Sequence, residues 1–440
     1  MYKLLGIFGF DPSKHKLSAE LEGGLAAFLT MAYILAVNPS LFGAVDGMPK
    51  GAVFTATALA SIIPTLLISL WARRPFGVSV GMGLNAFFVY TVCLTMGYHW
   101  QFALTAVLVE AVILCILSLT NAISKIAEAI PFSLKSAITA GIGLFIAFVG
   151  LQNMGITVKS DSTLVALGDL TSGKALLGVI GLTISCTLVM RHMKGGILIG
   201  IFATTIIGLF IKDPETGEAL TRFSGPVISL PESISPLFCQ YEWKAVLSPE
   251  LWSIVIALLF LDMFSMMGSV LALSAKAGYV DTDGNALDSH KSFTAISIGS
   301  MFSSLLGTSN VTPFMESAAG ISAGGRTGLT SFTTALCFAL ALLFSNVFLA
   351  IPPSATAPAL IIIGMTTIQS VTNVNWSNYR ESIPAFLTLI IMPMTYSISD
   401  GVFIGVIAYT VLYTFANRPT KISPLMYVLS VLFILKYIFL

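Results

Sequence analysis

Two short stretches decide the fold of this chain: PFGVSVGMGLN at residues 75–85 and GTSNVTP at residues 307–313. Each contains Gly or Pro residues that interrupt a membrane helix, and the segment next to the second stretch, 313–323, has only about ten apolar residues. Interrupted segments at corresponding places in two halves of a sequence are typical of transporters built from inverted repeats. We therefore predict broken helices in the third and the tenth membrane segment.

The composition agrees with a membrane location. Of 440 residues, 56% are hydrophobic and only 10% are charged, against about 25% charged in soluble domains. A net charge of +1 lacks the basic footprint of a nucleic-acid-binding protein. The five cysteines are scattered singly, without metal spacing or a disulfide framework. No nucleophile–base set is present, so we predict neither an enzyme nor a cofactor or metal site.

Stretches of about 20 apolar residues can span a bilayer, and the chain contains two sets of seven. The first set lies near 22–38, 52–72, 83–97, 101–120, 136–152, 174–190 and 195–211. The second set lies near 251–273, 291–307, 313–323, 329–350, 355–370, 382–398 and 400–416. A further apolar stretch, 423–440, is either an extra span or an interfacial helix.

The loop charges give an orientation. With the N-terminus in the cytoplasm, fifteen Lys and Arg residues fall in cytoplasmic segments and six on the opposite side, with Lys436 in the terminal stretch. Positive charge concentrates on the cytoplasmic side of membrane proteins. We therefore predict an all-α polytopic membrane protein with fourteen segments. Seven segments per half make the second half an inverted repeat of the first.

Ionisable residues at membrane depth are candidate functional residues because burying them in hydrocarbon is costly. Asp262 lies halfway along segment 251–273, and Glu316 follows Thr312-Pro313 at the predicted start of a half-helix. Glu110 lies in the middle of segment 101–120, where both structural packing and a functional role remain open.

A second group of candidates lies in the other half, in the stretch GMGLNAFF. Gly83 allows the backbone to approach a ligand closely, and Asn85 offers both a donor and an acceptor. Phe88 can supply a flat apolar surface. The alternative is that these residues only pack helices together.

At this point the chain resembles a known family. AAFLTMAYILAVNP at 26–39, GMGLNAFF at 81–88, GTSNVTPFMESAAGISAGGRTGLT at 307–330 and PAFLTLIIMPMTYSIS at 384–399 are similar to motifs of the AzgA-like adenine/guanine/hypoxanthine permeases. These permeases are a branch of the nucleobase–cation symporter-2 family. The resemblance runs nearly from end to end.

The resemblance implies a core domain and a gate domain with a purine site between the half-helices. The core would comprise 22–120 and 251–350, and the gate 136–211 and 355–416. The remaining parts are a cytoplasmic segment 1–21, an external connecting loop 212–250 and the terminal stretch 423–440. The implied substrate-binding residues are Glu316, Asn85, Gly83, Phe88, Asp262, Ser265 and Thr312.

One departure from the family pattern concerns the eighth segment, which reads DMFSMMGS at 262–269. Ser265 stands where family members usually have a second acid. We therefore predict that Asp262 alone is the proton-coupling group.

The expected function is secondary active import of purine nucleobases by proton symport and alternating access in the plasma membrane. Sodium is an alternative coupling ion, and a homodimer is left open. The alternative function is transport of a changed substrate (xanthine, uracil or another small molecule) or uncoupled facilitated transport, because Ser265 removes an acid.

Overall fold

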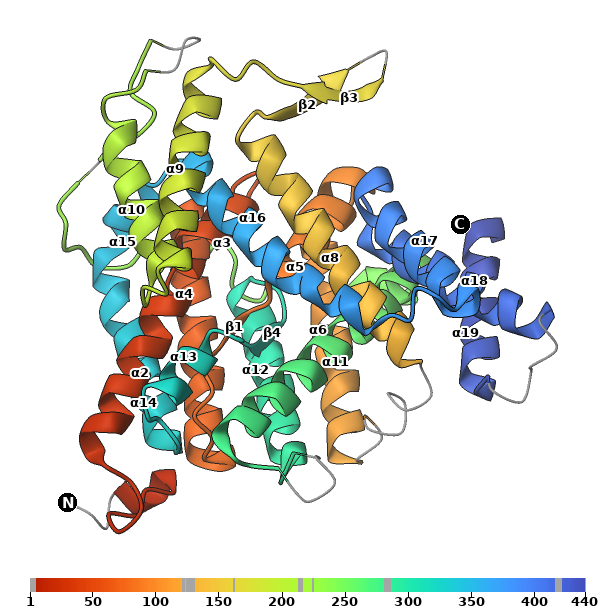
Figure 1. Ribbon diagram of the computed structural model, residues 1–440, viewed down its shortest axis with the longest axis horizontal. Helices are drawn as coiled ribbons and strands as arrows, with labels where there is room; N and C mark the ends of the chain where they lie inside the picture. Colours follow the sequence, from red (N-terminus) through yellow and green to blue (C-terminus); the bar gives the residue numbers. More distant parts are fainter. Residues whose placement is uncertain are drawn as a thin grey trace.

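The computed structural model describes residues 5–120, 123, 131–160, 163–212, 217–223, 225–280, 286–415 and 422–439. These residues are mainly helical (Figure 1). The elements of the first half are η1 (Gly6–Phe8), α2 (Leu17–Met31), α3 (Ile34–Phe42), α4 (Lys50–Leu67), η2 (Ile68–Ala72), β1 (Val78–Val80), α5 (Met82–Ala86), η3 (Phe87–Thr95), α6 (Trp100–Leu119), α8 (Phe132–Asn153), β2 (Thr157–Ser160), β3 (Leu164–Leu167), α9 (Gly173–Met190) and α10 (Gly196–Gly208).

The second half follows a similar order. Its elements are η4 (Trp243–Leu247), α11 (Pro249–Ala277), α12 (Ser289–Leu306), β4 (Val311–Pro313), α13 (Ser317–Ser322), α14 (Gly328–Ala341), η5 (Leu342–Phe344), α15 (Ser345–Leu349), α16 (Pro353–Ile368), η6 (Gln369–Asn373), α17 (Tyr379–Thr395), α18 (Ile398–Phe415) and α19 (Pro424–Phe439).

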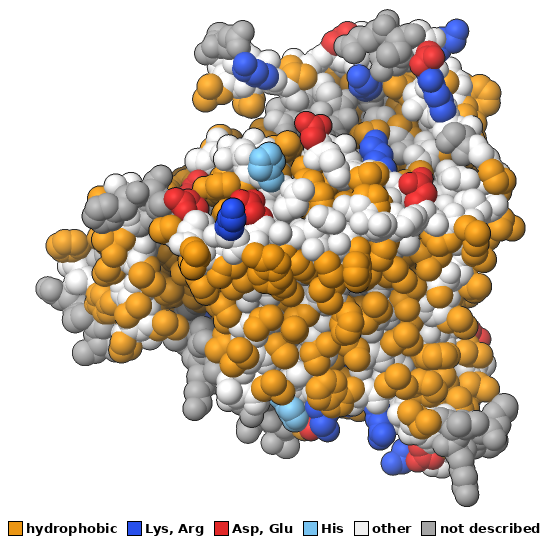
Figure 2. All heavy atoms as spheres, turned by 180° about the vertical axis from the view of Figure 1, so that it is seen from behind, with side chains coloured by type: hydrophobic (Ala, Val, Ile, Leu, Met, Phe, Trp, Pro, Cys, Tyr) orange, Lys and Arg blue, Asp and Glu red, His pale blue; other side chains and the backbone are white. Residues whose placement is uncertain are grey.

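The helices have the length and surface of a membrane protein. Within the described residues, nine helices are long and apolar enough to cross a bilayer, and three more apolar helices are shorter. Figure 2 shows a broad band of hydrophobic side chains, with charged side chains gathered above and below it. The mainly helical polytopic architecture is thus confirmed. Each predicted segment contains a helix, while the number of membrane crossings stays a prediction.

The first predicted segment, 22–38, differs from the structure. Two helices, α2 and α3, occupy this region, and the α-helix is interrupted at Ala32–Tyr33. Around the interruption the backbone bonds tighten to three-residue spacing, as from Leu35 N–H to the Ala32 carbonyl at 3.1 Å. Residues 25–37 contain neither glycine nor proline, so the sequence gives no sign of the interruption at Ala32–Tyr33.

The two predicted broken segments meet in a short antiparallel ribbon. β1 pairs with β4, with Val78 opposite Pro313, Ser79 opposite Thr312 and Val80 opposite Val311. Backbone groups at membrane depth need partners within the protein, and neighbouring helices supply some of them.

Hydroxyl side chains at corresponding positions in the two halves hydrogen-bond to backbone groups at the outer edges of this ribbon. Thr65 Oγ1 of α4 donates to the Val78 carbonyl and accepts from the Val78 N–H, both at 2.9 Å. In the second half, Ser300 Oγ of α12 accepts from the Val311 N–H at 3.0 Å. Both hydroxyl residues lie on the helix that precedes the strand, which is the arrangement expected of a structural repeat.

The helices pack into two groups. Helices α2–α6 contact α11–α14, whereas α8–α10 contact α16 and α8 also contacts α17 and α18. α19 packs on α18, where the Phe403 and Phe433 rings stack at 4.1 Å. The connecting stretch 212–250 is not wholly peripheral, because Leu237 is fully buried and lies against Gly307.

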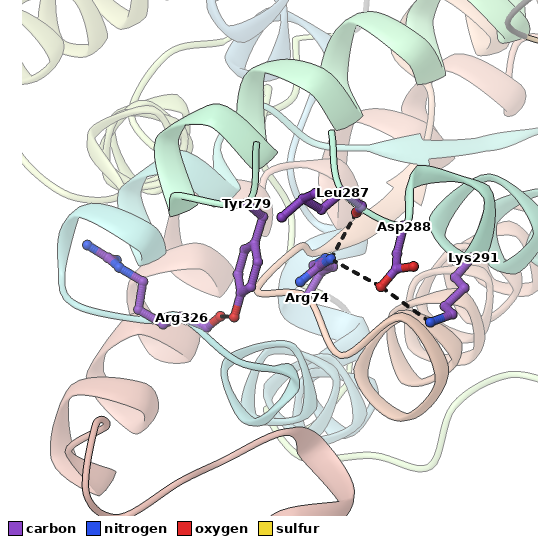
Figure 3. Close-up of polar contacts among 6 residues, drawn as sticks. All are labelled: Arg74, Tyr279, Leu287, Asp288, Lys291 and Arg326. Carbon is purple, nitrogen blue, oxygen red and sulfur yellow. Dashed lines mark hydrogen bonds and ion pairs between the residues drawn. The ribbon is translucent and has the colours of Figure 1, made fainter. Parts of the chain in front are cut away.

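A cluster around Arg74 fixes the turn between α11 and α12 to the end of α4–η2 (Figure 3). The Arg74 guanidinium lies 3.8 Å from the centre of the Tyr279 ring and donates to the Leu287 carbonyl at 2.9 Å. It also lies 3.9 Å from the Asp288 carboxylate, which pairs with Lys291 at 3.3 Å. This cluster lies on the face of the molecule that carries residues 5–16, called the N-terminal face below; the opposite face carries β2 and β3 and is called the hairpin face (Figure 1).

Candidate functional site

Glu316 lies at the junction between β4 and the short helix α13. Tyr33 Oη donates to Glu316 Oε1 at 2.8 Å, and Thr30 Oγ1 donates to the Glu316 carbonyl at 3.2 Å. Tyr33 lies in the interruption between α2 and α3, and Thr30 lies in the last turn before it. The close approach of these elements needs glycines, because a methyl group on Gly320 would lie 2.4 Å from the Gly23 carbonyl oxygen. The interruption in the first segment therefore positions the acid of the tenth.

The surface beside Glu316 is accessible and is bordered by α11. Glu316 and Ser265 are half-buried, Met315 is 50% exposed, and a side chain at Gly268 would meet no atom within 4 Å. Ser265 Oγ and Thr312 Oγ1 are 3.4 Å apart, so the eighth segment touches β4 directly. The structure thus brings the half-buried Ser265 to the buried Thr312, which lies four residues before the half-buried Glu316.

Asn85 is fully buried in α5. Its Oδ1 accepts a hydrogen bond from Ser309 Oγ, in the loop before β4. Its Nδ2 has no partner among the described residues. The residue therefore links α5 to the loop before β4 and keeps an amide NH2 group without a partner among the described residues.

Gly83 and Phe88 have different surroundings from Asn85. A methyl group on Gly83 would lie 2.7 Å from Ile142 Cγ2 of α8, so this glycine lets the two helix groups approach each other. Phe88 is 1% exposed and packs on Phe42 with ring centres 5.0 Å apart. A role for either residue in substrate binding stays a prediction.

Asp262 lies in a fully buried polar cluster with two other side chains. Asn310 Nδ2 donates to Glu110 Oε2, and the Asn310 amide lies beside the Asp262 carboxyl group. Asp262, Glu110 and Asn310 are all 0% exposed. Neither Asp262 oxygen has a hydrogen-bond partner of normal geometry among the described residues.

Aromatic side chains close the interface between the helix groups toward the hairpin face. The Tyr396 ring lies 5.6 Å from Tyr90, 5.3 Å from Phe145 and 6.1 Å from Phe148, in edge-on geometry. Tyr396 Oη also donates to Gln152 Oε1 at 2.7 Å, near the end of α8. These four rings, called the aromatic cluster below, link η3, α8 and the turn between α17 and α18.

Sequence reasoning missed Tyr33, Asn310 and the aromatic cluster. Tyr33 and Glu316 are 283 residues apart, and Asn310 and Glu110 are 200 residues apart. A sequence pattern over a few turns cannot report such pairs. Asn310 did carry one signal, because it lies inside the stretch GTSNVTP that predicted the broken tenth segment.

The chemistry available at the accessible surface is recognition of hydrogen-bond donors. A carboxylate accepts up to about four hydrogen bonds, and Tyr33 supplies one to Glu316. Ser265 and Thr312 add hydroxyl groups that donate or accept. This arrangement suits a ligand with adjacent N–H groups.

Comparisons with known proteins indicate the family of this chain. A permease family model, Xan_ur_permease, matches residues 18–426. The guanine/hypoxanthine permease PbuG of Bacillus subtilis is 38% identical, over 98% of this chain and 99% of the relative. The adenine permease AdeQ of Escherichia coli is 37% identical, over 95% of this chain and 92% of the relative.

Among solved structures, the transmembrane domain of the cyanobacterial bicarbonate transporter BicA is similar in fold. Its TM-score is 0.65 at 16% sequence identity, with 89% of this chain and 97% of that chain covered. The sequence matches confirm the predicted resemblance to the AzgA-like permeases, and they confirm that the protein is an integral membrane transporter and not an enzyme. The chain belongs to the Xan_ur_permease family of permeases.

Proposed function

We propose that this protein imports purine nucleobases (hypoxanthine, guanine, adenine or a subset of them) together with protons across the plasma membrane. The observation that carries this proposal is the carboxylate of Glu316 at the junction of β4 and α13, held by Tyr33 beside accessible surface. The names of the relatives, which include a guanine/hypoxanthine and an adenine permease, support the substrate class.

Glu316 is the proposed principal ligand of the base. A purine edge presents adjacent N–H groups, and a carboxylate accepts two of them as charge-assisted bonds. Ser265 and Thr312 are proposed to border the same ligand. Ser265 Oγ lies 3.4 Å from Thr312 Oγ1, which belongs to the strand that leads to Glu316 and supports this proposal. Asn85 contributes through its free amide donor.

Transport by alternating access is proposed from the two helix groups. The group formed by α2–α6 and α11–α15 acts as the core, and the group formed by α8–α10 and α16–α18 acts as the gate. The aromatic cluster supports a state that is closed toward the hairpin face. Leu271, which is 46% exposed, and Gly268 lie on the half of α11 that leads to the N-terminal face, which supports access from that face. With the N-terminus in the cytoplasm, this is an inward-facing state.

A second candidate function is favoured by Ser265. A serine at this position removes a negative charge from the accessible surface, which suits a changed substrate such as xanthine or uracil, or uncoupled facilitated transport. Proton-coupled uptake of purine bases and this alternative differ in which base is taken up and in whether a proton gradient is needed.

Uptake by proteoliposomes that contain the purified protein tests the proposal. Labelled hypoxanthine, guanine, adenine, xanthine and uracil are offered one at a time, with and without an inward proton gradient. We expect saturable accumulation of at least one purine base that a protonophore abolishes. Accumulation that a protonophore leaves unchanged contradicts proton coupling, and uptake confined to xanthine or uracil contradicts the proposed substrate class.

A further inference from the structure

The buried cluster of Asp262, Glu110 and Asn310 contains more acceptors than its one donor group, the Asn310 amide, can serve. Four of its side-chain oxygens have no hydrogen-bond partner among the described residues: Asp262 Oδ1, Asp262 Oδ2, Glu110 Oε1 and Asn310 Oδ1. Buried polar groups in folded proteins nearly always have a partner. Four orphan acceptors at one place therefore indicate a bound species that the protein side chains alone do not supply.

The two acids need positive charge, and no described cation supplies it. The described ion pairs join Arg74 or Lys291 to Asp288 and Arg222 to Glu218, all outside this cluster. Among the described residues, the side chain hydrogen-bonded to Glu110 is the neutral amide of Asn310. Two unpaired carboxylates side by side in a fully buried site cannot both stay ionised. At least one must hold a cation.

The chemistry of the cluster favours a proton as that cation. A proton needs one acceptor and can be shared between two carboxyl groups. Hard divalent metal ions instead need about six or more oxygen ligands, and the four orphan oxygens fall short of this number. All three residues are 0% exposed, so bulk solvent does not complete a coordination shell.

The cluster is also connected to the proposed substrate site. Asn310 directly precedes β4, and its carbonyl accepts from the Gly81 N–H at 3.0 Å, at the start of the first half-helix. Two residues further on, Thr312 touches Ser265. A change of protonation at the acids therefore acts on an element that reaches both broken segments.

We propose that Glu110 and Asp262 form one acid pair, bridged by Asn310, that holds the exchangeable proton of transport. In this arrangement α6 supplies the second carboxyl group, from a position 152 residues before Asp262, in place of the acid that Ser265 replaces on α11. Only an O–H bond forms and breaks: the pair takes up one proton from water on one side and releases it on the other. This inference rests on the proposed proton-coupled uptake and goes beyond the role of Asp262 alone.

The test compares Glu110→Gln and Asp262→Asn with wild type in two assays. In proteoliposomes we expect both variants to lose proton-driven accumulation, so that the ratio of inner to outer base falls to about 1, while exchange of labelled base persists. In weakly buffered detergent solution, base binding to the wild type is expected to take up protons, and both variants are expected to lose this uptake. Glu20→Gln is the matched control, because Glu20 is equally buried but accepts from the Thr327 N–H and from Thr330 Oγ1.

Several outcomes would overturn the pair. Proton-driven accumulation by Glu110→Gln at the wild-type level contradicts it while leaving the proposed function intact. Accumulation driven by a sodium gradient and not by a proton gradient would show that the coupling ion is Na⁺ and not a proton, and would contradict the pair.

Two further measurements keep the proposal testable if a variant fails to fold or if the wild type carries no purine base. Glu110→Asp keeps the carboxyl group and is expected to restore coupling in part. An infrared titration of the substrate-free wild type is expected to show one protonated carboxyl group at neutral pH, a band that Asp262→Asn or Glu110→Gln alters. A wild type without such a band contradicts the pair independently of the substrate.

Discussion

At the scale of single residues, the proposed site depends on Glu316 and the hydroxyl group that orients it. Tyr33 is fully buried and its ring stacks on Phe314 at 6.1 Å, so the donor to Glu316 has little freedom to move. A carboxylate that is held in place loses less conformational entropy when a ligand binds. The charge of Glu316 and its orientation by Tyr33 are therefore separable contributions to affinity.

Glu316→Gln is expected to weaken binding of the base by about 10- to 150-fold. The reason is that a hydrogen bond to a charged group contributes about 1.5–3 kcal/mol, and 1.4 kcal/mol is tenfold in affinity. Tyr33→Phe keeps the charge and loses one hydrogen bond, so a smaller loss of about fivefold is expected. Equilibrium binding of a labelled base to the purified protein measures both, and wild-type affinity in Glu316→Gln would rule out the ligand role.

The sequence predicted which residues matter at the site but not how all of their side chains are oriented. Asp262, Glu316 and Asn85 were identified because ionisable or polar residues are rare in apolar segments. The orientation of Phe88 was not predictable, because residues Phe87–Thr95 form a π-helix. Its wider turn rotates the side chains relative to an α-helix, and Phe88 packs against Phe42.

At the scale of elements, the contact between α5 and α8 decides how closely the two helix groups approach. Gly83 has no side chain, and Ile142 fills the space next to it. Ile142 is β-branched and stiff at its first torsion, so it cannot easily move away from an added methyl group. The sequence predicted a special position for Gly83, but it gave no indication that α8 was its neighbour.

Gly83→Ala is expected to lower uptake, and adding Ile142→Ala is expected to restore most of it. In the double variant the removed Ile142 side chain leaves room for the methyl group, which would otherwise lie 2.7 Å from Ile142 Cγ2. Initial uptake rates, corrected for the amount of protein in the membrane, measure the effect. No recovery in the double variant would show that the methyl group blocks the ligand itself.

The aromatic cluster leads to a second prediction at this scale. Tyr396→Ala removes three ring contacts, each about 0.5–1.5 kcal/mol, and the hydrogen bond to Gln152. We expect the state open toward the hairpin face to become more populated. A thiol from Ser265→Cys, in a chain without its five native cysteines, should then react faster with an impermeant maleimide added on that side.

Tyr396→Phe is the matched control for this experiment. It keeps the ring and loses only the hydrogen bond to Gln152 Oε1, so a smaller acceleration is expected. Equal labelling rates in Tyr396→Ala and the unsubstituted protein would mean that the aromatic cluster does not hold this face closed.

At the scale of the whole molecule, the Arg74 cluster holds distant parts of the chain together at the N-terminal face (Figure 3). Arg74→Ala removes the hydrogen bond to Leu287 and the contact with Tyr279, so we expect the free energy of unfolding to fall by about 1–3 kcal/mol. Arg74→Lys is expected to be intermediate, because it keeps the charge and loses the planar group. Thermal unfolding in detergent measures both, and an unchanged midpoint in Arg74→Ala would contradict a stabilising role.

The ribbon of β1 and β4 has a consequence for how the protein is made. Val80 pairs with Val311, so about 230 residues must be synthesised before the first strand meets its partner. At roughly 5–20 residues per second this takes about 10–50 s. During this interval the unpaired backbone of β1 cannot remain in lipid without cost. The first half of the chain must therefore wait, incompletely inserted or sheltered by the insertion machinery, until the ribosome has translated the tenth segment.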